Sequence, residues 1–386
     1  MNMYSLSDYG DMIADQARFE AYAKAIAEVV RPGDTVLDLG CGPGPLALLA
    51  CRAGASRVYA VELGESLGLA RELAVANGFA DRMIFLAGDS RKLELPERVR
   101  VVVSDLRGAL PLYDGAILSL EDARKRFLKP GGVLIPQRDT LLAAVIEADE
   151  KYARICAPWT QNGHGLNFSK GRELLLHSIH PIDCRREQLL TEAKPWMVLD
   201  YASGIGKQVE GTLTLRVLRR GTAHGICVWF DAQVWGQYGY SSGPLAASGA
   251  RATVYGQILL PWLMPVALEE GQEVIVELHA NPVGEDYIWR WNTTVGAAGV
   301  GEPLHFVQSS FWGATLSRET LRRKALDYVP MLAEDGQADR CVLEAMNGKQ
   351  SLEEIARTIV ENFPRQSSSF EEALRRVTRL AEKYSR

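Results

Sequence analysis

Apolar runs alternate with helical patterns along the first third of the chain. Short apolar strands are predicted at 34–39, 57–62, 82–87, 99–104 and 131–135. Amphipathic helices are predicted around and between them, at 11–29, 43–53, 65–77 and 117–128. Strands that alternate with helices are typical of a parallel sheet that helices flank. The pattern therefore predicts an α/β domain over residues 1–136.

The middle of the chain, residues 137–316, has a different pattern. Runs such as 212–218, 226–234 and 271–278 alternate apolar with polar residues, and clusters of glycine, proline and aspartate separate them. A period of two is typical of strands that bury one face. We expect an antiparallel sandwich or barrel, and we favour a β-barrel.

Residues 319–386 are predicted to form a small helical domain. Ser351 with Glu354, and Ser369 with Glu372, match the capping box, in which a hydroxyl and a carboxylate satisfy the first turn of a helix. Each match opens an amphipathic helix. A small winged-helix-like module fits this pattern.

Composition narrows the classes of function. Of 386 residues 47% are apolar, and the net charge of -5 argues against general binding to nucleic acid or to anionic membranes. The first residues lack the features of a signal peptide, and the apolar stretch 258–268 is too short to cross a bilayer. The six cysteines are scattered, with no C-x-x-C pair. We therefore expect a cytoplasmic protein with reduced thiols and no metal site.

The most informative segment is the glycine-rich turn at residues 36–44, Val-Leu-Asp-Leu-Gly-Cys-Gly-Pro-Gly, between a strand and a helix. Gly40 and Gly42 allow a ligand to approach the backbone, and Asp38 either orients the turn or receives an ammonium group. Glu62 ends the next strand, where a carboxylate can bind the two hydroxyls of a ribose. The G-x-G-x-G spacing resembles that of methyltransferases that use S-adenosylmethionine.

Two further positions are candidates for contacts with this cofactor. Asp89 and Ser90 follow the strand at 82–87 and can bind the adenine amine, although Asp89 also suits a simple turn. Arg18 lies three residues after Asp15 on a predicted helix, so the two can form a surface ion pair. Alternatively, the Arg18 guanidinium can bind the carboxylate of the cofactor in a bidentate way.

Four segments resemble the protein arginine N-methyltransferase family, in chain order as well as in motif. Residues 12–18 are similar to its M-L-x-D-x-x-R motif, and residues 36–44 to its V-L-D-[VL]-G-x-G-[TP]-G turn. Residues 104–114, Ser-Asp-Leu-Arg-Gly-Ala-Leu-Pro-Leu-Tyr-Asp, are similar to its substrate loop S-E-x-M-G-x-x-L-x-Y-E, and a helix end and strand at 128–136 follow.

The resemblance covers residues 9 to about 295. It implies a Rossmann-like class I methyltransferase domain followed by an antiparallel β-barrel, and it favours Arg18 as the ligand of the cofactor carboxylate. It also implies a homodimer, because the family pairs through an arm at the start of its barrel, where residues 156–180 lie here.

The substrate loop supplies two acidic residues, Asp105 and Asp114. A guanidinium has a pKa above about 12 and spreads its charge, so no nitrogen has a lone pair ready to attack. Two carboxylates can bind it, localise the charge and aim the remaining nitrogen at the sulfonium methyl group. The resemblance thus implies that Asp105 and Asp114 are catalytic; solvated loop aspartates are the alternative.

Several positions depart from the family pattern. Both family glutamates are aspartates here, each shorter by roughly 1.5 Å of reach. The family loop T-H-W-x-Q corresponds to residues 253–257, which puts Val254 at the position of its histidine. An acidic adenine contact of the family falls on Arg91, which makes Asp89 the substitute. These departures weaken the inference of arginine specificity more than the inference of cofactor binding.

The last segment carries a second resemblance. Residues 342–364, a helix, Asn-Gly-Lys and a capped helix that ends in Phe-Pro, resemble the small peptide chaperone domain used in making pyrroloquinoline quinone. Such domains bind leader peptides through strand addition and a helix groove. The resemblance implies that the tail binds a leader peptide.

The sequence as a whole predicts methylation of a guanidine of arginine in a peptide, a protein or a pathway intermediate. Two alternatives stay open. One is a methyltransferase for another nucleophile, such as an amine, a hydroxyl or a carboxylate. The other is an inactive scaffold that binds the cofactor and delivers a peptide through its tail.

Overall fold

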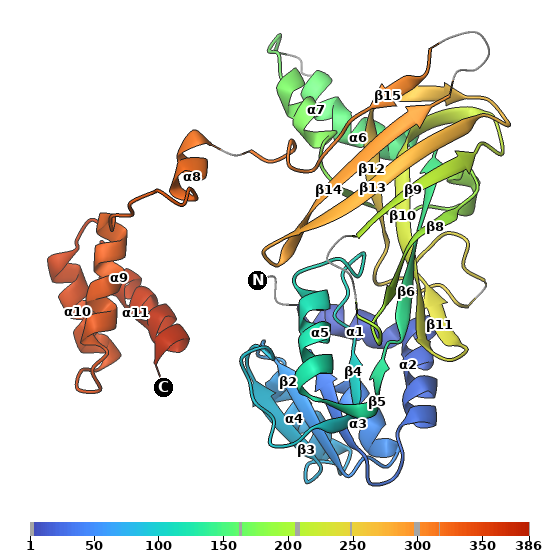
Figure 1. Cartoon of the computed structure of the whole chain (residues 1–386). Coiled ribbons are helices and arrows are strands. Elements are labelled where there is room, and N and C mark those ends of the chain that lie inside the picture. The colour runs from blue at the N-terminus through green and yellow to red at the C-terminus, as the bar shows by residue number, and fades with distance from the viewer. Residues whose placement is uncertain are drawn as a thin grey trace. The chain divides into compact units, whose positions relative to one another are not determined.

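The computed structural model describes residues 4–161, 164–204, 209–247, 249–296, 302–315 and 317–385 (Figure 1). The chain divides into two compact units, residues 1–314 and 315–386. Among the described residues, no helix has both the length and the apolar character needed to cross a bilayer.

The first unit begins with a parallel sheet in the order β3-β2-β1-β4-β5, which confirms the α/β prediction. Its strands are β1 (Thr35–Leu39), β2 (Arg57–Glu62), β3 (Met83–Ala87), β4 (Val99–Ser104) and β5 (Leu128–Ile135). Its helices are α1 (Leu6–Ala14), α2 (Gln16–Val29), α3 (Pro45–Arg52), α4 (Leu67–Ala76) and α5 (Ala116–Arg126). The central strands β1 and β4 are almost fully buried, because their branched apolar side chains face helices.

The first predicted helix, 11–29, was wrong in one respect, because the structure divides it at Asp15. Asp15 is both the last cap of α1 and the first cap of α2, with an extended backbone at φ -69° and ψ 91°. Its Oδ1 accepts a hydrogen bond from the Arg18 N–H at 3.2 Å, as an N-cap aspartate does. The local cap therefore outweighs the apolar periodicity that continues across it.

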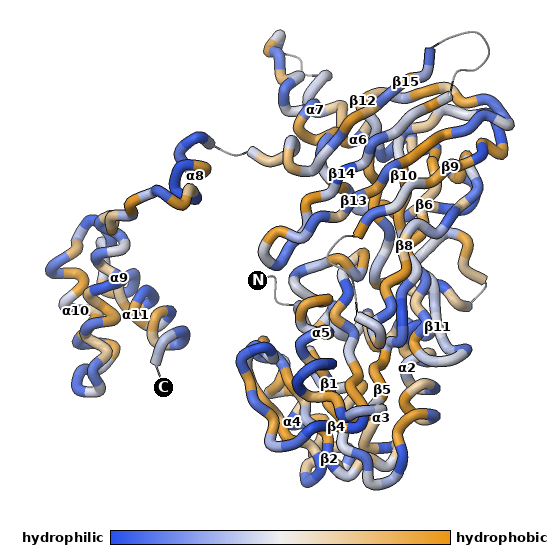
Figure 2. The backbone as a smooth tube through the Cα atoms, in the orientation of Figure 1, coloured by the Kyte–Doolittle hydropathy of each residue, from blue (hydrophilic) through white to orange (hydrophobic). Residues whose placement is uncertain are grey.

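Two antiparallel sheets follow in the same unit. The first has six strands, β6 (Arg138–Ile146), β7 (His180–Ile182), β8 (Lys194–Asp200), β10 (Gly221–Trp235), β11 (Tyr238–Ser241) and β12 (Gln257–Leu268). The second has four, β9 (Val209–Arg216), β13 (Glu273–Val283), β14 (Asp286–Val295) and β15 (Leu304–Phe306). The predicted period of two is confirmed along β13, where buried and exposed positions alternate. Figure 2 colours the backbone by the hydropathy of each residue. Hydrogen bonds between the described strands give two open sheets, so closure into one barrel stays a prediction.

Two cores hold this unit together. The larger one is continuous from the parallel sheet, with Val102, into both antiparallel sheets, with Phe230 and Trp291. The smaller one lies between β10 and the helices α6 (Asp149–Thr160) and α7 (Ser169–Leu175), and it contains Trp229. Because the larger core is shared, the parallel sheet and the antiparallel sheets have a fixed geometry, and this geometry positions the site.

The second unit is helical, with α8 (Arg318–Arg323), α9 (Glu334–Ala345), α10 (Leu352–Asn362) and α11 (Phe370–Tyr384). The capping box at Ser351 forms, while at Ser369 the hydroxyl caps α11 and the Glu372 carboxylate binds the Ser368 N–H instead. Val342, Ile359 and Val377 are fully buried in a core of its own. Residues 317–385 form no strand, so the wing of a winged-helix module is not seen in the described part of this unit.

We predict that Gly225→Ala destabilises the first unit by about 2 kcal/mol, because overpacking typically costs 1–3 kcal/mol. Gly225 lies in the central strand β10 at φ 156°, and an added Cβ would overlap the Leu260 carbonyl oxygen and lie 2.8 Å from Pro261 Cα. Urea unfolding followed by tryptophan fluorescence measures this, since all 8 tryptophans lie within residues 1–314. Gly68→Ala is the control, because Gly68 lies in α4 with no atom near the added Cβ. Equal midpoints for the two variants would contradict the prediction.

Candidate functional site

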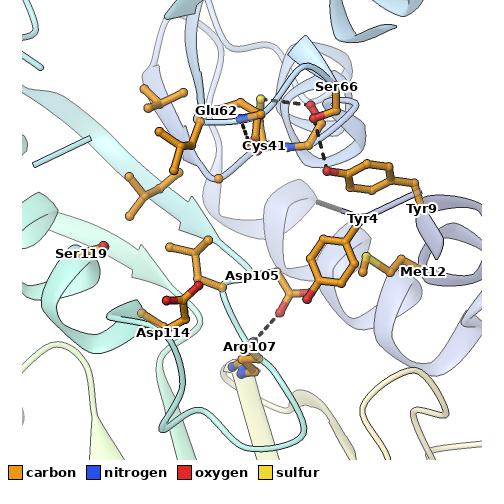
Figure 3. Close-up of a pocket in the computed structure, with 18 of the residues that line it drawn as sticks. Tyr4, Tyr9, Met12, Cys41, Glu62, Ser66, Asp105, Arg107, Asp114 and Ser119 are labelled. Carbon is orange, nitrogen blue, oxygen red and sulfur yellow. Dashed lines mark hydrogen bonds and ion pairs between the residues drawn. The ribbon is translucent and has the colours of Figure 1, made fainter. Parts of the chain in front are cut away.

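A cavity of about 970 Å³ lies at the carboxyl ends of the parallel strands (Figure 3). Its lining comes from the glycine-rich turn after β1, from the end of β2, from the loop after β4 and from α1. Val254 and Tyr255, from the loop before β12, close the side that faces the antiparallel sheets. Clefts at this edge of a parallel sheet are the usual ligand sites of α/β folds.

The glycine-rich turn is held by Glu62. Gly40 and Gly42 have φ values of 70° and 54°, which only glycine adopts without strain. The Glu62 carboxylate accepts the Gly42 N–H on Oε2 at 2.8 Å and the Gly64 N–H on Oε1 at 2.7 Å. Each carboxylate oxygen has a second lone pair, so Glu62 can fix the turn and still accept from a ligand hydroxyl.

The glycines also make room for neighbouring side chains. A Cβ on Gly40 would overlap the Leu106 side chain, and a Cβ on Gly42 would lie 2.8 Å from the Tyr9 ring. Tyr9 comes from α1, and its hydroxyl donates to Ser66 Oγ at 3.2 Å. The turn therefore receives α1 and the loop after β4 at close range, in addition to bounding the cavity.

Asp38 lies beneath the turn and not in the cavity wall. Its side chain is buried, and Oδ2 accepts the Ala47 N–H at 2.8 Å. Oδ1 is buried without a hydrogen-bond partner among the described residues. Burial raises the pKa of Asp38 to about 7. Of the two roles predicted for Asp38, these contacts favour orientation of the turn over direct contact with a ligand.

Asp89 and Ser90 both line the far end of the cavity, and Asp89 is paired. Arg91 binds the Asp89 carboxylate with its Nε at 3.1 Å and its Nη2 at 3.2 Å, and these bonds lower the pKa of Asp89. Arg91 Nη2 also binds Glu285, in the turn between β13 and β14, at 2.6 Å. The residue at the family's acidic adenine contact thus connects the cavity wall to the antiparallel sheet.

The Arg18 guanidinium does not pair with the Asp15 carboxylate, which contacts Arg18 only at its backbone N–H, so the ion pair that we considered is not formed. Arg18 Nε instead donates to the carboxylate of Asp105, and its Nη1 donates to the Met12 carbonyl oxygen at 2.8 Å. Asp15 is used elsewhere: its Oδ2 accepts the Thr253 N–H at 2.6 Å, together with the N–H of the next residue. Arg18 lines the cavity, and no partner of its Nη2 occurs in the described part of the chain.

Asp105 and Asp114 both line the cavity, on the wall opposite Glu62 (Figure 3). The Asp105 side chain is only 6% exposed, and besides Arg18 it accepts from Arg107 Nη1 at 2.9 Å and from the Tyr255 hydroxyl at 2.7 Å. Burial alone would raise the pKa of Asp105, but Arg18 and Arg107 outweigh it and hold the pKa below its ordinary value.

Asp114 is the opposite case. It is exposed, has a φ of 39°, and no polar partner for it occurs among the residues that the structure describes. The neighbouring Gly115 N–H donates to the Glu285 carbonyl oxygen at 2.7 Å, so the turn between β13 and β14 fixes the backbone beside Asp114. The loop thus presents one saturated carboxylate and one available carboxylate to the same cavity.

Sequence reasoning missed two residues of this site, Arg107 and Tyr255. Both lie in segments that we compared with family motifs, Arg107 at the methionine of S-E-x-M-G and Tyr255 at the tryptophan of T-H-W-x-Q. A polar residue in place of an apolar one was the available signal. What the sequence does not contain is their partner, since both side chains bind Asp105.

The residues around the cavity fit S-adenosylmethionine. Glu62 supplies carboxylate oxygens for ribose hydroxyls, and Arg18 has an Nη2 without a partner among the described residues, which can bind a carboxylate. Methyl transfer from a sulfonium requires no metal. Within the described residues, no group of three or more histidine, cysteine, aspartate or glutamate side chains could hold a metal ion.

Comparison with known proteins agrees with this geometry. Residues 36–132 match the family model described as a methyltransferase domain. The chain is 33% identical over 238 residues to probable protein arginine N-methyltransferase 6 of Arabidopsis thaliana, which covers 58% of this chain and 54% of that protein. It is 30% identical over 246 residues to protein arginine N-methyltransferase 1 of Dictyostelium discoideum, covering 59% of this chain and 69% of that protein.

The fold is also shared with a solved structure, the Trypanosoma brucei PRMT1 enzyme-prozyme heterotetrameric complex with AdoHcy. The TM-score is 0.70 at 21% identity, and the match covers 78% of this chain and 96% of that chain. The chain spans about half the length of the Arabidopsis relative, at 54%. It spans more than two thirds of the Dictyostelium relative, at 69%. On the strength of that match, the chain belongs to the protein arginine N-methyltransferase family.

Proposed function

We propose that this protein is an S-adenosylmethionine-dependent N-methyltransferase that methylates a guanidino nitrogen of arginine in a peptide, a protein or a pathway intermediate. The observation that carries the proposal is the composition of one cavity. One wall of this cavity holds the glycine-rich turn and Glu62, and the opposite wall holds Asp105 and Asp114. A cofactor site and a cation site therefore open into the same space.

The cofactor side follows from the contacts above. Glu62 would bind the ribose, Asp89 and Ser90 would bind the adenine amine, and the Nη2 of Arg18 would bind the carboxylate. Gly40 and Gly42 would border the methionyl part, with Asp38 beneath them. The AdoHcy of the Trypanosoma brucei complex supports this choice of cofactor.

S-adenosylmethionine supplies a sulfonium methyl group, which the acceptor nitrogen takes as the carbon–sulfur bond breaks and an N–H proton leaves. The acidic loop would perform the positioning. Asp114 has no polar partner among the described residues, so its charge is available to bind an incoming guanidinium. Asp105 is buried and fixed, so it would orient the cation with little rearrangement.

Two other functions fit the same cavity less well. A methyltransferase for an amine, a hydroxyl or a carboxylate would need no acidic loop of this kind, and mass spectrometry of products from a panel of acceptors would reveal it. An inactive scaffold would bind the cofactor without turnover on any arginine peptide. The available carboxylate of Asp114 beside a cofactor-sized cavity favours the active enzyme.

We further propose a homodimer that uses the segment 156–180 as an arm. The support is that two large apolar side chains close together in this segment, Leu166 and Phe168, are 59% and 41% exposed. A double substitution of both residues by serine should then give a monomer in sedimentation, and a monomeric unaltered chain would contradict the arm.

The helical tail is a candidate site for a leader peptide. The segment before α9 supports this, because Leu326, Val329 and Met331 are 108%, 85% and 91% exposed, so the described residues of the second unit leave them uncovered. A fluorescent leader peptide would bind the intact chain in an anisotropy titration, and substitution of Leu326 and Met331 by serine would abolish that binding. Binding that survives the substitution would exclude this segment.

We predict that Asp114→Asn lowers kcat on an arginine peptide by about 100-fold, because it removes the available charge on the acceptor side only. Cofactor affinity, measured by calorimetry, should stay within about twofold, since Asp114 binds no residue that contacts the glycine turn. Radiolabelled methyl transfer measures the rate. Asp81→Asn is the matched control, because Asp81 is an exposed aspartate outside the cavity. Full activity of Asp114→Asn would refute the cation site.

We predict that Glu62→Gln weakens cofactor binding about tenfold or more, because the amide can accept only one of the two loop N–H bonds and loses the charge. Calorimetric titration of the intact chain with S-adenosylhomocysteine measures the loss. Glu65→Gln is the control, since Glu65 also lines the cavity but is exposed. If both variants bind as the unaltered chain does, Glu62 is not a cofactor ligand.

A further inference from the structure

Arg107 is a buried arginine in the loop at residues 104–114, and its guanidinium is almost fully hydrogen-bonded. Nε and Nη2 bind the two oxygens of Asp139 at 2.8 and 2.7 Å, and Nη1 donates to the Tyr22 hydroxyl at 2.7 Å. Nη1 also donates to Asp105 at 2.9 Å (Figure 3). The side chains of Arg107 and Asp139 are 3% and 0% exposed.

This arrangement is unusual for its position. The family loop has a glutamate where Asp105 stands and a methionine where Arg107 stands. A buried arginine–aspartate pair is rarely more stable than an apolar pair of similar volume, because both charges lose their hydration. A methionine would fill this space without that cost. The pair therefore needs a reason other than stability, and its contact with Asp105 supplies one.

We propose that Arg107 is a positioning residue for methyl transfer, which fixes the shortened carboxylate of Asp105 at the acceptor end of the cavity. The inference rests on the proposed function, because it assigns a role within the same site. Asp105 has a shorter reach than glutamate, and Arg107 binds its Oδ1 from within the same loop. Tyr255 binds both oxygens from the opposite side, while Arg18 binds Oδ2.

Arg107 also changes the net charge around the Asp105 carboxylate. Arg18, Arg107 and the Tyr255 hydroxyl contact its carboxylate directly. Tyr22, Tyr240, Tyr4, Asp38 and Asp139 are the further titratable groups that face this cluster. With two cations beside it, Asp105 offers little net charge to an acceptor. Asp105 therefore sets orientation, and Asp114 supplies the attraction for a cationic acceptor.

The test uses the full-length chain with Arg107→Met, which restores the family residue. Among the described residues, that variant leaves the Asp139 carboxylate with the Tyr201 hydroxyl at 2.5 Å as its one side-chain partner, so it risks misfolding. The double variant Arg107→Met/Asp139→Asn removes both charges, keeps the net charge and still lets the asparagine oxygen accept from Tyr201. Arg219→Met is the matched control, because Arg219 pairs with Glu147 at 3.0 Å away from the cavity.

Two measurements decide the proposal. A carbon-detected NMR titration should place the pKa of Asp105 about one unit or more higher in the double variant, because a neighbouring cation is lost. On an arginine peptide, kcat should fall about 10- to 100-fold, while the KM for the peptide changes less. The acid limb of the pH profile of kcat should move to higher pH, since Asp105 with a raised pKa is protonated at higher pH. Compared with the double variant, Arg107→Lys should have a low pKa of Asp105 again, because it keeps the cation, but only part of the kcat of the unaltered chain.

A double variant that folds would overturn the proposal if the acid dissociation constant of Asp105 and kcat both stay within about twofold of their values in the unaltered chain. Arg107 would then have a structural role alone. The titration needs no substrate, so it reports on the Arg107–Asp105 contact even if no arginine peptide is methylated. If the unaltered chain methylates no arginine peptide, this result would instead contradict the proposed function.

Discussion

The buried carboxylate of Asp105 is the interaction on which the geometry of this site depends. It accepts hydrogen bonds from Arg18 of α2, from Arg107 of its own loop and from Tyr255 of the loop before β12. These three donors come from the parallel-sheet part and from the antiparallel part of one unit. Burying a carboxylate costs free energy unless hydrogen bonds compensate for its lost hydration, so the three donors together stabilise Asp105 in this position.

Because its hydrogen bonds are saturated, Asp105 differs from Asp114 in the charge that it can offer to a ligand. A carboxylate that already binds two arginines can hold a geometry but attracts a further cation only weakly. Asp114 has a left-handed φ, an exposed side chain and a backbone fixed by the Glu285 turn, so it combines available charge with a defined position. In the proposed function, the available carboxylate of Asp114 would bind the cation and the fixed carboxylate of Asp105 would orient it, an asymmetric arrangement that the symmetric motif with two glutamates does not suggest.

The sequence predicted what depends on local pattern. The strands of the parallel sheet, the glycine turn and the place of Glu62 follow from periodicity and spacing, which act over a few residues. The break at Asp15 was missed because a cap contact competes with apolar periodicity. The pairing of Arg18 with Asp105 and of Arg91 with Glu285 joins residues 87 and 194 positions apart, and no local rule specifies such partners. The acidic loop was therefore predictable as a motif and not as a bonded cluster.

The departures from the family pattern acquire a common explanation when their contacts are considered together. Shortening a glutamate to Asp105 withdraws the carboxylate toward its backbone, and the changes at Arg107 and Tyr255 both introduce donors that reach it there. The loss of the histidine at Val254 is met in the same way, because Asp15 accepts the backbone N–H of that residue at 3.1 Å. Substitutions that each weaken the motif when taken singly thus give, as a set, a fully bonded Asp105 carboxylate. Changing one of them alone, as with Arg107→Met, should therefore disturb the site more than changing the set.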